Sequence, residues 1–163
     1  MLFVGVAGFA QEGTNLSNDG YDGGFRLGFG LNGSYATGDY FEWGLGGDVR
    51  LQYDLTKRTS LTFTTGFTHL FAEEVEGQPD INGLSYVPAK LGFKAFIWED
   101  SFYVLGEVGA AFAVTKDVDE TAFVWAPGIG YANENFDLSL RYESMEDFET
   151  NQIALRLAYG FKL

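Results

Sequence analysis

Apolar and polar residues alternate one by one along most of the chain, and no window shows a sustained helical period. Residues 41–55 are the clearest case, with Phe, Trp, Leu, Val and Tyr at the odd positions and Glu, Gly, Asp, Arg and Gln at the even ones. Such alternation places successive side chains on opposite faces of a β-strand. The pattern predicts strands over residues 25–35, 41–55, 61–71, 84–97, 102–114, 121–131, 136–143 and 153–163.

Eight strands account for nearly all of the chain after residue 23 and leave no room for a helix. Strands of about ten residues or more exceed the length of about 5–6 that is usual in soluble sheets, and they match the 9–11 residues that cross a membrane at a tilt. The predicted fold class is therefore all-β: an eight-stranded antiparallel up-and-down transmembrane β-barrel over residues 24–163.

The connections support this topology because they alternate in kind. Those after the second, fourth and sixth strands are short, whereas those after the third, fifth and seventh are longer or more acidic. Outer-membrane barrels have short periplasmic turns and longer outer loops. With eight strands, both ends of the barrel domain fall on the short-turn side.

The charges of the strands share one face, which we expect to line the interior. They are Arg26, Glu42, Asp48, Arg50, Asp54, Lys90, Lys94, Glu107, Asp137, Arg141, Glu143, Arg156 and Lys162. The opposite face carries large apolar side chains that would overfill a lumen of eight strands. A soluble, lipocalin-like ligand-binding barrel, with its charges outside, is the alternative. Seven cations and six anions inside a narrow barrel must pair, so we predict a closed, salt-bridged interior whose individual pairings the sequence does not determine.

Aromatic residues favour the membrane barrel over the soluble one because they gather near the strand ends in two belts, as interfacial girdles do. The belt near the long loops comprises Phe41, Trp43, Phe71, Phe123, Trp125 and Tyr142. The belt near the short turns comprises Tyr53, Phe102, Tyr131, Phe136, Tyr159 and Phe161.

Composition excludes several function classes. The chain carries 10 Lys and Arg against 23 Asp and Glu, a formal net charge of -13, which argues against nucleic acid as a partner. It has no cysteine, so disulfides, thiolate zinc sites and a cysteine nucleophile are excluded. We predict no cofactor and no resident metal. The segments expected outside hold 11 acids against Lys116 alone, which allows divalent cations or a basic partner to bind there but equally suits simple solvation.

The first 23 residues look distinct from the barrel. Residues 1–10 are uncharged and resemble the end of a signal peptide, with small residues at Gly8 and Ala10 where a signal peptidase acts; an apolar first strand is the alternative. Residues 11–23 are rich in Gly, Asn, Ser and Asp and suggest a flexible leader.

Together these features resemble the small eight-stranded outer-membrane β-barrels, the family of outer-membrane protein A and X domains and their porin-family relatives. The resemblance implies a monomer in the outer membrane of a Gram-negative bacterium, with membrane lipid and the barrel assembly machinery as partners. The last strand is similar to the assembly signal of such barrels, although Leu163 rather than an aromatic residue is last. Family members serve as structural anchors or surface-interaction proteins and occasionally as lipid-modifying enzymes.

An enzymatic role has little support in the sequence. His69 is the only histidine and lies on the lipid-facing parity, with Thr65 and Ser85 as loose nucleophile candidates. Pro88 and Pro127 interrupt strands and predict a missing ladder hydrogen bond. We therefore predict a non-catalytic protein with a structural or surface-interaction role through its acidic outer loops; an acyltransferase or deacylase that uses His69 is the alternative.

Overall fold

The computed structural model describes residues 24–37, 41–72, 83–99, 101–114, 120–148 and 150–163. Eight strands and one short 3₁₀ turn make up this part of the chain. They are β1 (Phe25–Ala36), β2 (Phe41–Asp54), β3 (Thr59–Ala72), β4 (Leu84–Trp98), β5 (Phe102–Ala113), β6 (Thr121–Ala132), β7 (Phe136–Met145), η1 (Glu146–Phe148) and β8 (Thr150–Lys162). The predictions for residues 1–10 and 11–23 lie outside the described residues.

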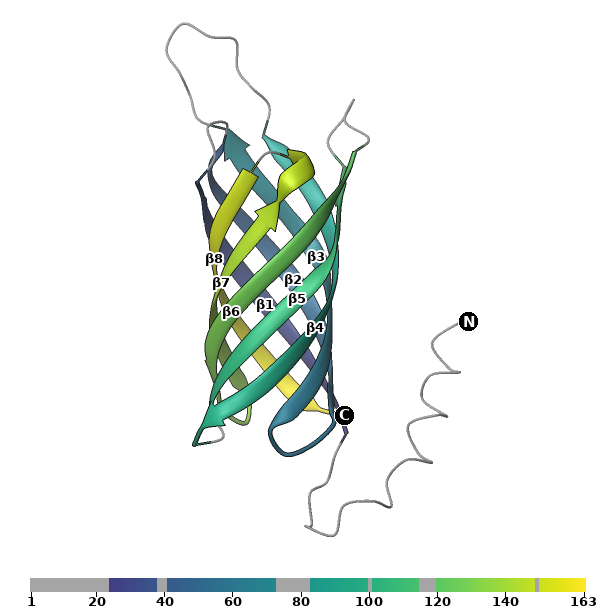
Figure 1. Ribbon diagram of the computed structural model, residues 1–163, viewed down its shortest axis with the longest axis vertical. Helices are drawn as coiled ribbons and strands as arrows, with labels where there is room; N and C mark the ends of the chain where they lie inside the picture. Colours follow the sequence, from purple (N-terminus) through teal and green to yellow (C-terminus); the bar gives the residue numbers. More distant parts are fainter. Residues whose placement is uncertain (1–23, 38–40, 73–82, 100, 115–119, 149) are drawn as a thin grey trace, which may run out of the picture.

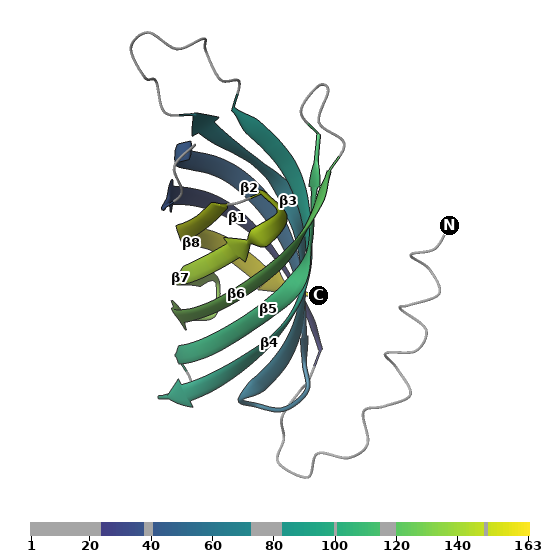
Figure 2. The same ribbon diagram turned by 45° about the horizontal axis from the view of Figure 1, so that its top comes forward.

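The strands pair in sequence order and close into a single antiparallel barrel, β1 to β8. Closure comes from β1 and β8, whose register runs from Arg26 opposite Lys162 to Ala36 opposite Gln152. The strands are strongly tilted against the long axis (Figures 1 and 2), as barrel closure requires. The predicted fold class is confirmed.

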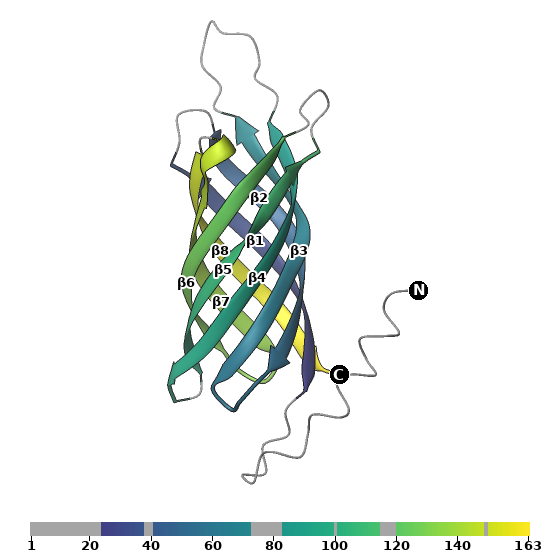
Figure 3. The ribbon, with the colours of Figure 1, turned by 45° about the vertical axis from the view of Figure 1, so that its right-hand side comes forward.

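One end of the barrel carries the tight turns between β2 and β3, β4 and β5, and β6 and β7, and the C-terminus lies at this same end (Figures 1 and 3). The turns are short because local hydrogen bonds close them: the Leu55 amide donates to the Thr59 carbonyl at 2.9 Å, and the Asn133 amide donates to Phe136 at 2.9 Å. We call this the short-turn end and the opposite one the loop end.

At the loop end, β7 and β8 extend further than the pattern predicts. The sequence suggests a connection over residues 144–151, but β7 continues to Met145 and β8 begins at Thr150 opposite it. Met145 is fully buried among Leu70, Leu84 and Val124. Burial of this apolar side chain prolongs the strand, and η1 completes the connection.

The two strand prolines interrupt pairing without shifting the register. Pairing of β3 with β4 stops between Thr65–Ala89 and Thr68–Tyr86, around Pro88. Pairing of β6 with β7 stops between Trp125–Ser144 and Gly128–Arg141, around Pro127. A proline lacks the amide hydrogen that the ladder needs, so the predicted local openings are present.

The exterior of the barrel is apolar. Large hydrophobic residues are exposed along every strand, among them Phe29, Leu91, Ile129 and Leu155. Charged side chains such as Arg50, Lys90 and Glu107 are at least 97% buried in the lumen. This is the reverse of a soluble barrel, so the lipocalin-like alternative is wrong: burying these charges while exposing the apolar residues is favourable only where lipid surrounds the wall.

Aromatic cross-strand pairs mark both ends of this apolar surface. At the loop end, Trp43 stacks on Phe71 with ring centroids 4.0 Å apart, and Trp125 contacts Tyr142. Three pairs lie at the short-turn end: Phe25–Tyr53, Phe102–Tyr131 and Phe136–Tyr159. The two predicted belts are thus built from neighbouring strands; the Phe41 side chain lies outside the described part. No described helix is long and apolar enough to cross a membrane.

Candidate functional site: the charged lumen and its vestibule

The even-numbered residues of β2 follow one another along the axis of the lumen, so they show which groups lie at each height. From the short-turn end inward, Asp54 accepts a hydrogen bond from Arg26 (3.0 Å), Gln52 contacts Lys94 (3.4 Å), Arg50 donates to Glu107 (2.9 Å) and Asp48 accepts from Arg156 (2.6 Å). Alternation directs all four into the lumen. Their partners come from the adjacent strand β1 and from β4, β5 and β8, so the three inner layers join strands that are not neighbours.

Glu107 is the centre of a compact network at mid-height. Its Oε1 accepts from Arg50 (2.9 Å) and from the Thr64 hydroxyl (3.1 Å), and its Oε2 lies 3.1 Å from Arg141 and 3.4 Å from Lys90. Glu143 shares the same two cations, at 2.7 Å from Lys90 and 3.4 Å from Arg141. We call these five charged residues (Arg50, Lys90, Glu107, Arg141 and Glu143) the charged belt.

A second pair lies beside the belt. Arg156 holds Asp48 with both Nε and Nη2, at 2.8 and 2.6 Å, the bidentate geometry that makes such pairs strong and directional. Asn32 connects this pair to the belt, because it donates to Asp48 (2.6 Å) and accepts from Arg141 (2.7 Å). The lumen is therefore crossed by one continuous set of hydrogen bonds.

The structure brings together eleven of the thirteen charges that the alternation places inside. Each of these eleven takes part in an ion pair with another: Arg26, Asp48, Arg50, Asp54, Lys90, Lys94, Glu107, Asp137, Arg141, Glu143 and Arg156. Glu42 and Lys162 were expected inside too, but both are exposed. Each stands at the edge of the barrel, Glu42 at the loop end and Lys162 at the short-turn end, where water reaches the side chain.

Sequence reasoning missed the neutral residues that complete the network. Tyr86 accepts from Gln152 (2.7 Å), and Gln152 also donates to Glu143 (2.7 Å). The Tyr103 hydroxyl donates to Asp137, and its ring lies 3.9 Å from the Lys94 ammonium, a cation–π contact. The sequence did contain a signal for them: Tyr86 and Tyr103 stand at the alternating positions that carry the polar residues of their strands, so their side chains have to face the lumen.

Apolar side chains close the lumen above the belt. Leu70, Leu84, Tyr86, Val124 and Met145 form one buried cluster with Ala111 and Ala122 at the loop end. A cavity of about 20 Å³ lies beside the belt, which is room for about one water molecule. The charged belt and this cluster thus fill much of the described lumen between the vestibule and the loop end.

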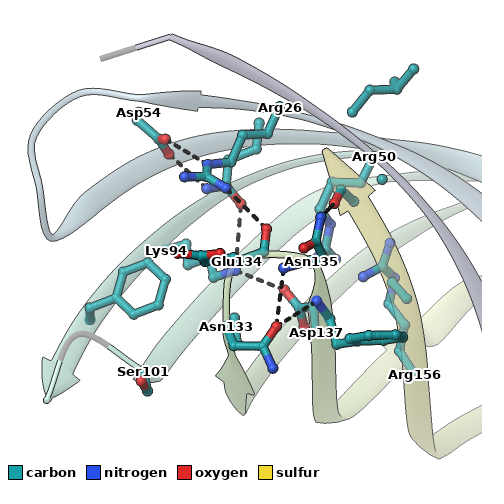
Figure 4. Close-up of a pocket in the computed structure, with 18 of the residues that line it drawn as sticks. Arg26, Arg50, Asp54, Lys94, Ser101, Asn133, Glu134, Asn135, Asp137 and Arg156 are labelled. Carbon is teal, nitrogen blue, oxygen red and sulfur yellow. Dashed lines mark hydrogen bonds and ion pairs between the residues drawn. The ribbon is translucent and has the colours of Figure 1, made fainter. Parts of the chain in front are cut away.

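Below the belt, the lumen widens into a cavity of about 470 Å³, which we call the vestibule. It is lined by residues of the short turns, among them Lys57, Glu99 and Asn133, and reaches inward to Arg50 and Arg156. Figure 4 shows two ion pairs in its wall: Arg26 with Asp54, and Lys94 with Asp137 at 2.8 Å.

On the outer surface, His69 Nδ1 lies 2.6 Å from the Ser85 hydroxyl, across the β3–β4 pair. The imidazole also packs edge-on against Phe71, with centroids 4.6 Å apart. Thr65, the other candidate nucleophile, lies four residues before His69 on the same outward parity. Glu73 and Glu74, which follow His69 in the sequence, lie outside the described residues. Among the described residues, no group of three or more His, Asp or Glu could hold a metal ion.

Comparison with known proteins finds likeness in structure alone. No protein-family model matches the chain, and no curated protein sequence matches it significantly. The outer-membrane protein Ail of Yersinia pestis in a phospholipid nanodisc is similar, with 18% identity, 86% of this chain and 100% of that chain covered, and a TM-score of 0.59.

Two further barrels are similar. The N-terminal β-barrel domain of Pseudomonas aeruginosa OprF shares 15% identity over 86% of this chain and 100% of that one, with a TM-score of 0.54. A de novo designed transmembrane β-barrel shares 13% sequence identity over 86% of this chain and 98% of that one, with a TM-score of 0.56. At these identities the likeness concerns the fold. The chain is thus a membrane-type β-barrel, with the eight-stranded architecture of small outer-membrane proteins.

Proposed function

We propose that this protein is a monomeric, non-catalytic barrel of the Gram-negative outer membrane, with a structural or surface-contact role and no transport through its lumen. The observation that carries the proposal is the charged belt, which crosses the lumen between the vestibule and the apolar cluster. A closed lumen leaves the lipid-facing wall and the outer loops as the working surfaces. Membrane lipid and the barrel assembly machinery are the proposed partners.

Conductance in planar bilayers tests the closed lumen. The purified barrel should insert without discrete current steps, because the ion pairs leave no continuous aqueous path. The same protein unfolded by heat before addition is the control. Discrete, reproducible steps from the folded protein alone would refute the proposal and favour a small pore.

Cell fractionation tests the location. The protein should sediment with the outer membrane and should migrate faster on a gel when it is not heated, since a closed barrel keeps its compact shape in detergent. Recovery in the soluble fraction without a mobility shift would contradict membrane insertion.

The acidic outer segments suggest the kind of partner. Ail has been crystallised with the heparin analogue sucrose octasulfate, a polyanion. In this chain, 11 acids against one base in the segments expected outside would repel such a ligand. We therefore propose divalent cations or a basic partner as the contact of the loops.

Whole cells that display the barrel can test this contact, because a cationic peptide reaches only the outer loops. Substitution of Glu73, Glu74 and Glu76 by Gln should reduce peptide binding, and more so at low salt. The matched control replaces Glu99 and Glu134, acids of the short turns, by Gln and should leave binding unchanged. Equal peptide binding by all variants would contradict the proposal that the acidic loops bind a basic partner.

A lipid-modifying enzyme is the second candidate, and one observation favours it: the His69–Ser85 hydrogen bond of 2.6 Å on the outer face, the arrangement in which a base activates a serine. The cavity of about 20 Å³ beside the belt cannot hold an acyl chain, so a substrate would have to lie against the outer wall. Mass spectrometry can test this candidate on lipids from cells that carry His69→Ala, Ser85→Ala or the control Thr65→Ala. A lipid product lost in the first two variants and kept in the third would establish the enzyme.

A further inference from the structure

The vestibule is large for the interior of an eight-stranded barrel. Its volume of about 470 Å³ falls within the range of about 300–1,000 Å³ typical of small-molecule sites. Small residues create this space: Gly28, Ala158 and Gly160 line it from β1 and β8. A Cβ added at Gly28 would approach nothing closer than 3.6 Å, so a side chain fits there and the sequence leaves that room unfilled.

The acids that line the vestibule stand in its wall and at the short turns: they are Asp54, Glu99, Glu134 and Asp137. In the wall, Arg26 and Lys94 face carboxylates that also line the cavity, Asp54 and Asp137. The inner end is different. Arg50 and Arg156 line the cavity, but their partners do not: Glu107 and Asp48 are absent from the lining.

Two nearly buried guanidinium groups therefore form the inner end. The carboxylates they pair with lie beyond the cavity, and Asp137 in the wall is the lining acid that acts on Arg50. Arg50 donates one hydrogen bond from Nε to Thr64 and one from Nη2 to Glu107. Its buried Nη1 has no hydrogen-bond partner in the described part of the chain. Buried donors rarely stay unpaired. Amides of Gln52, Asn133 and Asn135 add further polar groups around the cavity.

We propose that the vestibule binds a small oxyanion, a phosphate or carboxylate group, with its charge directed toward Arg50 and Arg156. Guanidinium groups suit such planar or tetrahedral oxygens because they offer several donors in a fixed geometry. The mouth lies among the short turns, which face the periplasm in outer-membrane barrels. The ligand is accordingly either a free anion from that side or the phosphate of an inner-leaflet lipid headgroup.

Titration of inorganic phosphate into the 15N-labelled barrel, in a non-ionic detergent that contains no phosphate, tests the site. Amide signals of Gly28, Asn135 and Gly160 should shift in a saturable manner. Chloride at the same ionic strength and glycine betaine, a zwitterion, should not reproduce the shift. If either comparator matches phosphate, the response is not specific to an oxyanion, and if phosphate gives no saturable shift, it does not bind; either result makes the proposal wrong.

Two variants localise the response. Gly28→Leu fills the cavity and should abolish the shift, whereas Gly33→Leu, where a side chain meets nothing within 4 Å, is the matched control on β1 and should keep it. Asn133→Asp retains the acceptor that holds the Asn135 and Phe136 amides but adds a negative charge at the cavity. It should weaken binding by about threefold, the size of one solvent-screened charge interaction.

Asn133→Asp also keeps the test decisive where Gly28→Leu does not fold. Undiminished binding in Asn133→Asp, or in a folded Gly28→Leu, would overturn the site. Bilayers of phosphatidylglycerol then distinguish the source. If they shift the same amides without added phosphate, the ligand is a lipid headgroup; if free phosphate alone does so, it is a periplasmic anion.

Discussion

Neutralising Glu107 should destabilise the barrel more than neutralising any charge at its mouth. Three cations lie within 3.4 Å of this carboxylate: Arg50, Lys90 and Arg141. At an effective dielectric of 20, one such contact at about 3 Å is worth roughly 5 kcal/mol of gross attraction. Desolvation of the buried groups offsets most of it, and removal of one partner of a buried pair costs about 3–5 kcal/mol.

Glu107→Gln keeps the shape and the contact with Thr64 but leaves Glu143 alone among three buried cations. We expect a loss of about 3–5 kcal/mol in the free energy of unfolding. The matched control is Asp54→Asn. Asp54 is buried, but its partner Arg26 is 39% exposed, and the asparagine oxygen can still accept from Gln52 and Ser60; the cost should stay at about 1 kcal/mol because solvent reaches one side of the pair.

Urea unfolding of the two variants and the parent in lipid vesicles measures these differences, with tryptophan fluorescence as the signal and gel mobility as a check of the folded state. A central role for Glu107 is excluded if the stability of Glu107→Gln lies within about 1 kcal/mol of the parent, or if Asp54→Asn loses as much stability as Glu107→Gln. Either result would mean that the belt is hydrated enough to absorb a missing charge.

Two further substitutions probe the wall. Leu155→Arg places a cation in the middle of the lipid-facing side of β8 and should cost about 2–4 kcal/mol in the same unfolding assay; a neutral result would contradict lipid contact at that height. Gly130→Ala drives a methyl group into the Tyr103 ring and should cost about 1–3 kcal/mol, whereas Gly33→Ala, with open space around it, should be neutral. Equal effects of the two alanines would show that the Tyr103 ring is free to move.

Alternation of apolar and polar residues is enough to predict the strands and the side that most residues face. Strict alternation in β2 separates Trp43 and Leu45, on the outside, from Asp48 and Arg50, on the inside, because the side-chain period of a strand is two. It did so less well at strand ends. Met145 extends β7 because a tertiary cluster buries it. Glu42 is exposed at the edge of the barrel, where the β2–β3 register shifts between Phe41 and Trp43 and interrupts the alternation.

Which charges meet depends on the closed barrel. Arg50 and Glu107 stand on β2 and β5, 57 residues apart and not on neighbouring strands, so no local pattern relates them. Closure of the barrel, with its tilt and the β1–β8 register, sets which side chains share a height across the lumen. The same closure leaves the counter-ions of Arg50 and Arg156 behind the inner end of the vestibule. The side of the wall that a residue faces follows from the two-residue period of its own strand. Which residue it meets across the lumen follows from the arrangement of all eight strands.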